Sequence, residues 1–213
     1  ALIHAAWEQP GVARGNAATL GFSAGGSIAL LAAIREPEIV RVVDFFGPTD
    51  FFGTFAQDLL LSILDDDPPG LASIPELQAS VVDPLERGEL SLPDMRLELL
   101  RRSALHFVDR LPLVLAHHST VDGVVSVRET EALERAVQQA GGAIEAHYYA
   151  GGGHSPFGLR GSLSRTAAFL GVLSPAGRRA HAPEESDSRS SWASSASFPI
   201  GSHPAKGWLP PMQ

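Results

Sequence analysis

The sequence predicts an α/β fold in which a parallel β-sheet has helices on both sides. Two observations predict it. Short apolar, β-branched runs alternate with longer segments of helical character, and glycine or proline marks most of the breaks between them. This alternation is typical of βαβ units, in which strands run parallel and helices connect them. With 213 residues, 44% of them hydrophobic, the chain is long enough for one domain with a sizeable core.

The front of the chain predicts two helices and two strands. In order they are a helix over 2–8, a strand over 17–22, a helix over 24–35 and a strand over 39–46. Proline or glycine follows three of these elements, at Pro10-Gly11, Pro37 and Gly47-Pro48. The strand over 17–22 is the exception, because it runs directly into the helix over 24–35.

Residues 51–111 contain no clear strand and predict a helical insertion. Helices are expected over 55–64 and 94–106, with a break at Pro68-Pro69-Gly70. Two interpretations of this insertion stay open. It is either a lid that partly covers a functional site or a set of connecting helices that pack on the sheet.

The back of the chain predicts two more strands, over 112–118 and 143–149, separated by a helix. Ser126 and Glu129 match a capping box, in which the serine bonds forward and the glutamate reaches back to the start of that helix. From 173 to 213 serine, proline and glycine dominate and periodicity is lost. We expect a catalytic-type domain over 1–172 and a disordered tail over 173–213.

The turn Gly21-Phe22-Ser23-Ala24-Gly25 has the pattern G-x-S-x-G between a predicted strand and a predicted helix. This context is that of a nucleophile elbow, in which a strained turn exposes a serine. The turn leaves little room for side chains, a demand that Gly21 and Gly25 are expected to meet. The free N–H groups of the following helix would face a developing oxyanion. The alternative is an ordinary glycine-rich turn before a helix.

A nucleophilic serine needs a base and an orienting acid, and candidates for both follow the later strands. Asp122 lies in the loop after the third predicted strand, and His154 lies in a glycine-rich loop after the fourth. Asp50, which follows the second predicted strand, is the reserve candidate for the acid. His147 is a poor candidate for the base because it lies within a strand.

These segments resemble the C-terminal part of an α/β-hydrolase of the esterase, dienelactone hydrolase and prolyl oligopeptidase-like group. Members carry a GxSxGG turn, an HGxxD segment and a GGGH segment, which here stand at 21–26, 117–122 and 151–154. The resemblance covers about residues 1–172, and His118 departs from the usual glycine. It implies a catalytic triad of Ser23, Asp122 and His154, and an oxyanion-hole donor at the Ala24 N–H.

The resemblance also implies the reaction. We expect hydrolysis of carboxylic esters through an acyl-enzyme, with a small-molecule ester or a short peptide as substrate and with no cofactor. Alanine after the serine is similar to small-ester hydrolases, whereas the related peptidases often carry tyrosine there. A prolyl oligopeptidase-like serine peptidase is the alternative.

Only about 20 residues precede Ser23, whereas a complete α/β-hydrolase places several strands and an HGGG-type loop before its nucleophile. We therefore expect a fragment, or one half of a catalytic domain, and an inactive truncated hydrolase is a further alternative. The outer edge of the strand over 17–22 would then lack a partner. Such an edge predicts oligomers through strand pairing.

Charge and composition exclude several other classes. The net charge of −8, without a basic cluster, argues against nucleic acid and anionic membranes as partners. No apolar run is long enough to span a bilayer. The chain has no cysteine, so a reducing compartment is permitted and the cytoplasm is favoured. No metal site is expected: Asp65-Asp66-Asp67 lacks the spacing of a calcium loop, and consecutive His117 and His118 would face opposite sides of a strand.

Overall fold

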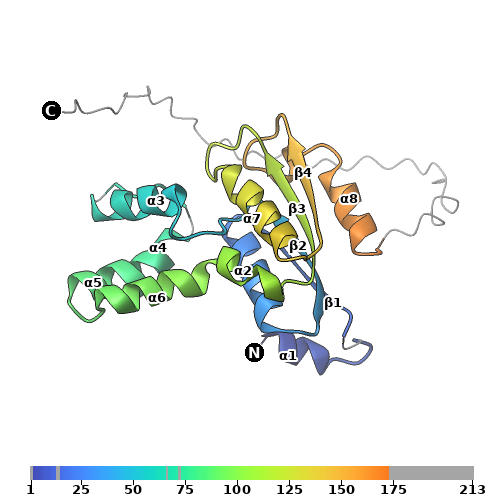
Figure 1. Cartoon of the computed structure of the whole chain (residues 1–213), viewed down its shortest axis with the longest axis horizontal. Helices are drawn as coiled ribbons and strands as arrows, with labels where there is room; N and C mark the ends of the chain where they lie inside the picture. The colour runs from blue at the N-terminus through green and yellow to red at the C-terminus, as the bar shows by residue number, and fades with distance from the viewer. Residues whose placement is uncertain (1, 13–14, 66, 72, 173–213) are drawn as a thin grey trace, which may run out of the picture. The chain divides into compact units, whose positions relative to one another are not determined.

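The computed structural model describes residues 2–12, 15–65, 67–71 and 73–172, so the predicted tail lies outside the described residues. Figure 1 shows the order of the elements. The strands are β1 (Ala17–Phe22), β2 (Ile39–Phe45), β3 (Leu113–Ser119) and β4 (Ile144–Tyr149). The α-helices are α1 (Leu2–Trp7), α2 (Ala24–Arg35), α3 (Thr54–Leu64), α4 (Ile74–Leu77), α5 (Asp83–Glu86), α6 (Leu92–Arg102), α7 (Arg128–Gln139) and α8 (Ser162–Phe169).

The four strands form one parallel sheet in the order β1-β2-β3-β4, which confirms the predicted parallel sheet. Each strand therefore pairs with the next one along the chain, through a helical or mixed connection. Because the strands run parallel, the loops after β1, β2, β3 and β4 all leave from the same end of the sheet, at the carboxyl ends of the strands. In open α/β sheets, ligands bind at this end.

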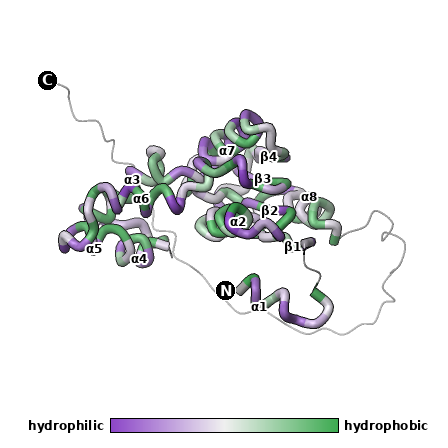
Figure 2. Tube along the Cα trace, turned by 60° about the horizontal axis from the view of Figure 1, so that its bottom comes forward, coloured by the Kyte–Doolittle hydropathy of each residue, from purple (hydrophilic) through white to green (hydrophobic). Residues whose placement is uncertain are grey.

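Alternate residues of the central strands face two different cores. Val42 of β2 and Val114 of β3 pack in the core that includes α2 and α7. Their neighbours Val43 and Leu115 pack on the other face with Phe169 of α8. Figure 2 shows hydrophobic segments along α2 and the sheet, and further ones in the helices of the insertion. The sheet is thus covered on both faces, as predicted, although α8 was not among the predicted elements.

The insertion is more broken than predicted. Helix α3 has nearly the expected bounds, but α6 ends at Arg102 instead of 106, and a 3-10 segment over Ala104–Arg110 follows it. Between them the chain forms α4, a π-helical turn over Gln78–Val82, and α5, none of which was predicted. Their apolar side chains form a separate core, with Leu59, Leu77, Val81 and Leu99 buried.

None of the helices in the described ranges combines the length and the apolar character that crossing a bilayer requires.

Candidate active site

Ser23 occupies a strained turn between β1 and α2. Its backbone has φ 54° and ψ −128°, a region that residues with a side chain rarely adopt. The Ser23 N–H donates to the carbonyl of Phe45 at 2.8 Å, which ties the turn to the end of β2. The Ser23 carbonyl accepts from the N–H of Gly26 at 2.8 Å and so begins α2. The strand–turn–helix context expected around this serine is therefore present.

Glycine is required in this turn, but not at both predicted positions. A Cβ on Gly21 would lie 1.9 Å from the carbonyl oxygen of Gly25, so no side chain fits there. The prediction for Gly25 is wrong, because a Cβ on it would meet nothing within 4 Å outside its own helix. The second tight position is Gly26, where a Cβ would lie 2.0 Å from a carboxylate oxygen of Asp44.

The N–H of Ala24 lies in the first turn of α2, next to Ser23. Within the described part of the chain it donates to no hydrogen-bond acceptor. Such orphan N–H groups, together with the positive end of the helix dipole, attract negative charge. Ser23 and Ala24 both line the same cavity, described below.

Asp122 and His154 lie together at the ends of β3 and β4. The Nδ1 of His154 and the Oδ2 of Asp122 are 2.8 Å apart, and the Asp122 side chain has no exposed area. The other oxygen of Asp122 accepts from the N–H groups of Val124 at 2.8 Å and Val125 at 3.0 Å. The carboxylate is thus held by the acid loop itself, with one oxygen left for the imidazole.

Phe46 links this pair to the serine turn. It follows Phe45, the partner of the Ser23 N–H, and its own N–H donates to the carbonyl of His117 at 2.9 Å. Phe46 has φ 45°, and its buried ring packs on the His154 imidazole at 4.4 Å between centroids. The side chains of Ser23 and His154 make no hydrogen bond to each other among the described residues. Their approach therefore stays a prediction.

His118, where glycine is usual in the resembled group, holds the loop that follows Asp122 through hydrogen bonds of its imidazole. Its buried imidazole donates from Nε2 to the carbonyl of Val125 at 3.0 Å and accepts at Nδ1 from the hydroxyl of Thr130 at 2.7 Å. Burial lowers the pKa of His118, which favours the neutral ring that this pattern requires. The side chain therefore joins the acid loop to α7 without adding a positive charge beside Asp122.

The predicted capping box is wrong, because α7 begins after Val127 and no side chain caps its start. The hydroxyl of Ser126 accepts from a backbone N–H two residues ahead, but the Glu129 carboxylate does not reach back to the helix start. Instead, one Glu129 oxygen accepts from the N–H groups of Thr49 at 2.8 Å and Asp50 at 3.0 Å. Glu129 thus fixes the loop after β2. The sequence pattern could not reveal this contact, because a glutamate at position 129 fits equally well as a helix cap and as an acceptor for the loop after β2.

Asp50, the reserve acid, makes no hydrogen bond or ion pair with His154 among the described residues. One of its oxygens accepts from the N–H of Phe52 at 2.9 Å and lies 3.4 Å from the Nε2 of His106. His147 contacts Glu145 of its own strand at 2.6 Å. His117 and His118 contact different elements, α8 and α7, as their opposite directions predicted.

Asp44 of β2 lies beneath the serine turn and was not singled out from the sequence. One of its oxygens accepts from the N–H of Gly47 at 3.1 Å, and the other is buried without a partner in the described residues. Burial, supported by the charge of Glu129, raises the pKa of Asp44 from 3.8 to about 7. The carboxyl is therefore protonated in the folded protein at mildly acidic pH.

This shift predicts a pH-dependent stability. Between about pH 4 and 7 the unfolded chain ionises Asp44 while the folded chain keeps it protonated, so the stabilisation present below pH 4 is lost as pH rises towards 7. The cost is about 1.4 kcal/mol per pKa unit. Asp44→Asn keeps the site neutral, so urea unfolding at pH 5.5 and 8.5 should show a flatter pH profile than the original protein. Parallel profiles, or equal flattening in the exposed control Asp109→Asn, would refute the assignment.

A cavity of about 660 Å³ opens beside Ser23. Helix α2 forms one wall, and the insertion forms the other through α3, α4 and α6. Most of its lining is apolar, and its charged residues come from α2, α4 and α6. Concave sites of this size that are mainly apolar with a few polar groups are typical of small-molecule binding.

The fold has many solved counterparts, although neither a protein-family model nor a curated protein sequence matches the chain. An acetyl xylan esterase from Thermoanaerobacterium superposes with a TM-score of 0.56 at 19% identity, covering 79% of this chain and 49% of that one. A puromycin-hydrolysing peptidase of Mycobacterium tuberculosis gives 0.60 at 22% identity, covering 80% and 24%. Both neighbours are α/β-hydrolases. The chain has part of the α/β-hydrolase fold.

An acylaminoacyl peptidase from Pyrococcus horikoshii gives a TM-score of 0.57 at 15% identity, covering 79% of this chain and 25% of that one. The chain therefore spans half or less of the length of each of these three neighbours. At these identities the likeness shows the fold alone, so the chemistry rests on the residues of this chain.

Proposed function

We propose that this protein is a serine hydrolase that cleaves carboxylic esters. Ser23 is the nucleophile at a nucleophile elbow, His154 is its general base, and Asp122 orients the histidine. The observation that carries the proposal is the pair of buried Asp122 and partly exposed His154, 2.8 Å apart. The two residues follow β3 and β4 at the same end of the sheet as the strained Ser23. No other described histidine has a wholly buried carboxylate at hydrogen-bond distance.

Each residue has a role in the reaction. The Nε2 of His154 takes the proton of Ser23 as the serine oxygen attacks the carbonyl carbon, and the resulting oxyanion accepts from the Ala24 N–H. His154 then returns the proton to the departing alcohol, which leaves an acyl-enzyme. Water, activated by His154, attacks the acyl group and releases the acid. Asp122 holds Nδ1–H throughout and stabilises the imidazolium.

An ester is favoured over a peptide bond as the substrate. The residue after the serine is alanine, as is common in the small-ester hydrolases that the chain resembles. A peptidase remains the second candidate because two of the structural neighbours are named as peptidases. The helical insertion, which supplies one wall of the cavity at Ser23, would serve as a lid in either case.

The proposal is tested by covalent labelling. A fluorophosphonate should modify the protein at one residue, and mass spectrometry of the digested adduct should place the modification on Ser23. Ser23→Ala should not be labelled, whereas the exposed control Ser164→Ala should be labelled like the original protein. Comparison of p-nitrophenyl acetate with an alanine p-nitroanilide separates an esterase from a peptidase. Labelling that persists in Ser23→Ala would refute the assignment.

A further inference from the structure

The cavity at Ser23 extends along α2 to the far end of that helix. Residues Ser27, Ile28, Leu31 and Arg35 of α2 all line it, at the three- and four-residue spacing of one helix face. Helix α2 has 12 residues, so Ser23 and Arg35 lie about 18 Å apart along its axis. Long side chains on a helix generally lean towards its N-terminus, which shortens the distance between the serine and the guanidinium.

The middle of the cavity is apolar. Leu31 of α2 faces Phe55 and Leu59 of α3 and Leu77 of α4 across it. A chain that leaves Ser23 in this direction would therefore exchange water for hydrocarbon contacts, which favours an extended apolar group.

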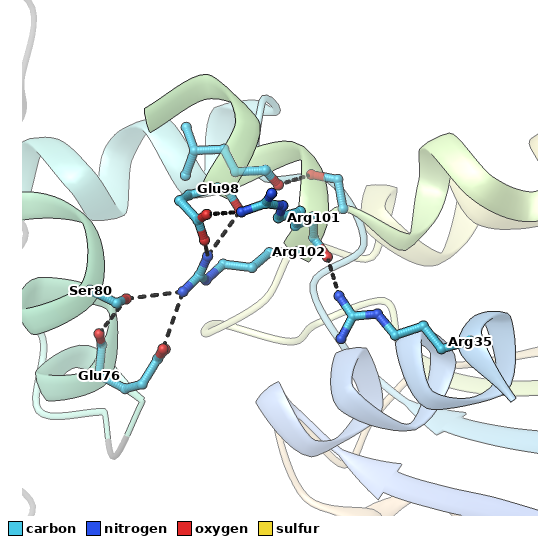
Figure 3. Close-up of polar contacts among 8 residues, drawn as sticks. Arg35, Glu76, Ser80, Glu98, Arg101 and Arg102 are labelled. Atoms are coloured by element: carbon cyan, nitrogen blue, oxygen red, sulfur yellow. Dashed lines mark hydrogen bonds and ion pairs between the residues drawn. The ribbon is translucent and has the colours of Figure 1, made fainter. Parts of the chain in front are cut away.

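The far end of the cavity carries charged side chains, most of which form ion pairs with one another. Figure 3 shows Arg102 of α6 reaching Glu98 on its own helix and Glu76 of α4. The corresponding distances are 2.8 and 3.2 Å, and Arg101 also pairs with Glu98. The hydrogen bond from Arg102 lowers the pKa of Glu98, which keeps this carboxyl ionised. The two carboxylates thus serve the two arginines of α6.

Arg35 is the third guanidinium at this end, and it has no carboxylate partner among the described residues. Its single described hydrogen bond runs to the backbone carbonyl of Arg101 at 3.3 Å (Figure 3). A guanidinium carries five N–H donors, so most of those on Arg35 are free to bind another acceptor. The far end of the cavity therefore has one positive charge more than its carboxylates neutralise.

We propose that Arg35 binds a carboxylate at the far end of the substrate's acyl chain. The substrate class is an ester whose acyl group is extended, mainly apolar and terminated by an anion. A medium-length dicarboxylic acyl chain has this chemistry, and so does an acidic N-acyl peptide of roughly four residues, which spans about 13 Å. The inference rests on the proposed function for the position of the reacting ester at Ser23, and it adds the group recognised at the other end.

The experiment measures binding, so that it does not depend on turnover. Decanedioate carries a carboxylate where decanoate carries its terminal methyl group, and N-succinyl-trialanine and N-butanoyl-trialanine differ in the same way on a peptide. Calorimetric titration of all four into Ser23→Ala gives the preference for the second carboxylate. We expect it to be roughly tenfold, as for a hydrogen bond to a charged group. If only one pair shows tighter binding of the member with the additional carboxylate, that pair shows whether the site takes a dicarboxylic acyl chain or an acidic peptide.

Arg35→Gln, made in the Ser23→Ala protein, should abolish the preference while leaving decanoate binding unchanged. Arg110→Gln is the matched control, because Arg110 is exposed and does not line the cavity. Equal affinities within both pairs would overturn the proposal. So would an Arg35→Gln variant that loses both acids equally, because Arg35 would then only join α2 to α6. Failure of the proposed function is distinguishable, since it would appear as phosphonate labelling that does not require Ser23.

Discussion

Asp122→Asn is expected to lower the turnover number for ester hydrolysis by a factor on the order of 10⁴. The reason lies in how both carboxylate oxygens are used. Oδ1 accepts from the N–H groups of Val124 and Val125, so an asparagine keeps its oxygen there. Its NH₂ group then faces the Nδ1 of His154, which must give up its proton and accept. The proton moves to Nε2, and the imidazole can no longer act as a base towards Ser23.

The measurement is the turnover of p-nitrophenyl acetate by the original protein and by each variant. Circular dichroism confirms that each variant folds. Asp50→Asn is the matched control, because Asp50 also follows a strand at its carboxyl end but contacts His106 instead of His154. It should change the rate little. The reverse result, a large loss with Asp50→Asn and a small one with Asp122→Asn, would move the acid to Asp50.

Self-association through β1 is the second large effect that we expect. β1 pairs only with β2 among the described strands, so its outer N–H and C=O groups have no ladder partner. Leu20 and Phe22 of β1 are each 41% exposed. An unpaired apolar edge of this kind pairs with other chains. Sedimentation velocity at micromolar concentration should therefore show dimers or larger species for this chain.

A lysine on the edge should suppress the association, because burying its charge between paired strands is unfavourable. Leu20→Lys is expected to raise the dissociation constant roughly tenfold or more, about 1.4 kcal/mol for each factor of ten. Leu163→Lys is the matched control, since Leu163 is 46% exposed on α8, away from the edge. A monomeric original chain, or equal effects of the two lysines, would contradict this expectation.

Local patterns predicted the sheet and its order of elements well, for physical reasons. β1 and α2 have the predicted bounds because the strained turn at Ser23 forces an abrupt change from strand to helix. Strand β2 ends one residue early, at Phe45, because Phe46 adopts a positive φ that leaves the extended conformation. No feature of a phenylalanine in an apolar run announces such a backbone conformation.

The predictions that were wrong or missing concern features that long-range contacts determine. Glu129 matched a local cap, yet its carboxylate binds a loop 80 residues earlier in the chain. Helices of four residues such as α4 and α5 are too short to show periodicity, so only their packing in the insertion reveals them. Asp44 was visible as a single acid in an apolar strand, and that contrast could have marked it as a buried titratable group.

The central claim, that Ser23, His154 and Asp122 act as one triad, is tested most directly by one distance. A crystal structure of the phosphonate adduct would give the separation of the Ser23 Oγ from the His154 Nε2. We predict a separation within hydrogen-bond reach, about 2.6–3.2 Å, with Asp122 still bound to Nδ1 on the far side of the ring. A separation above about 6 Å, with no movement of the 151–154 loop that could close it, exceeds that reach and would show that the three residues do not act as a triad.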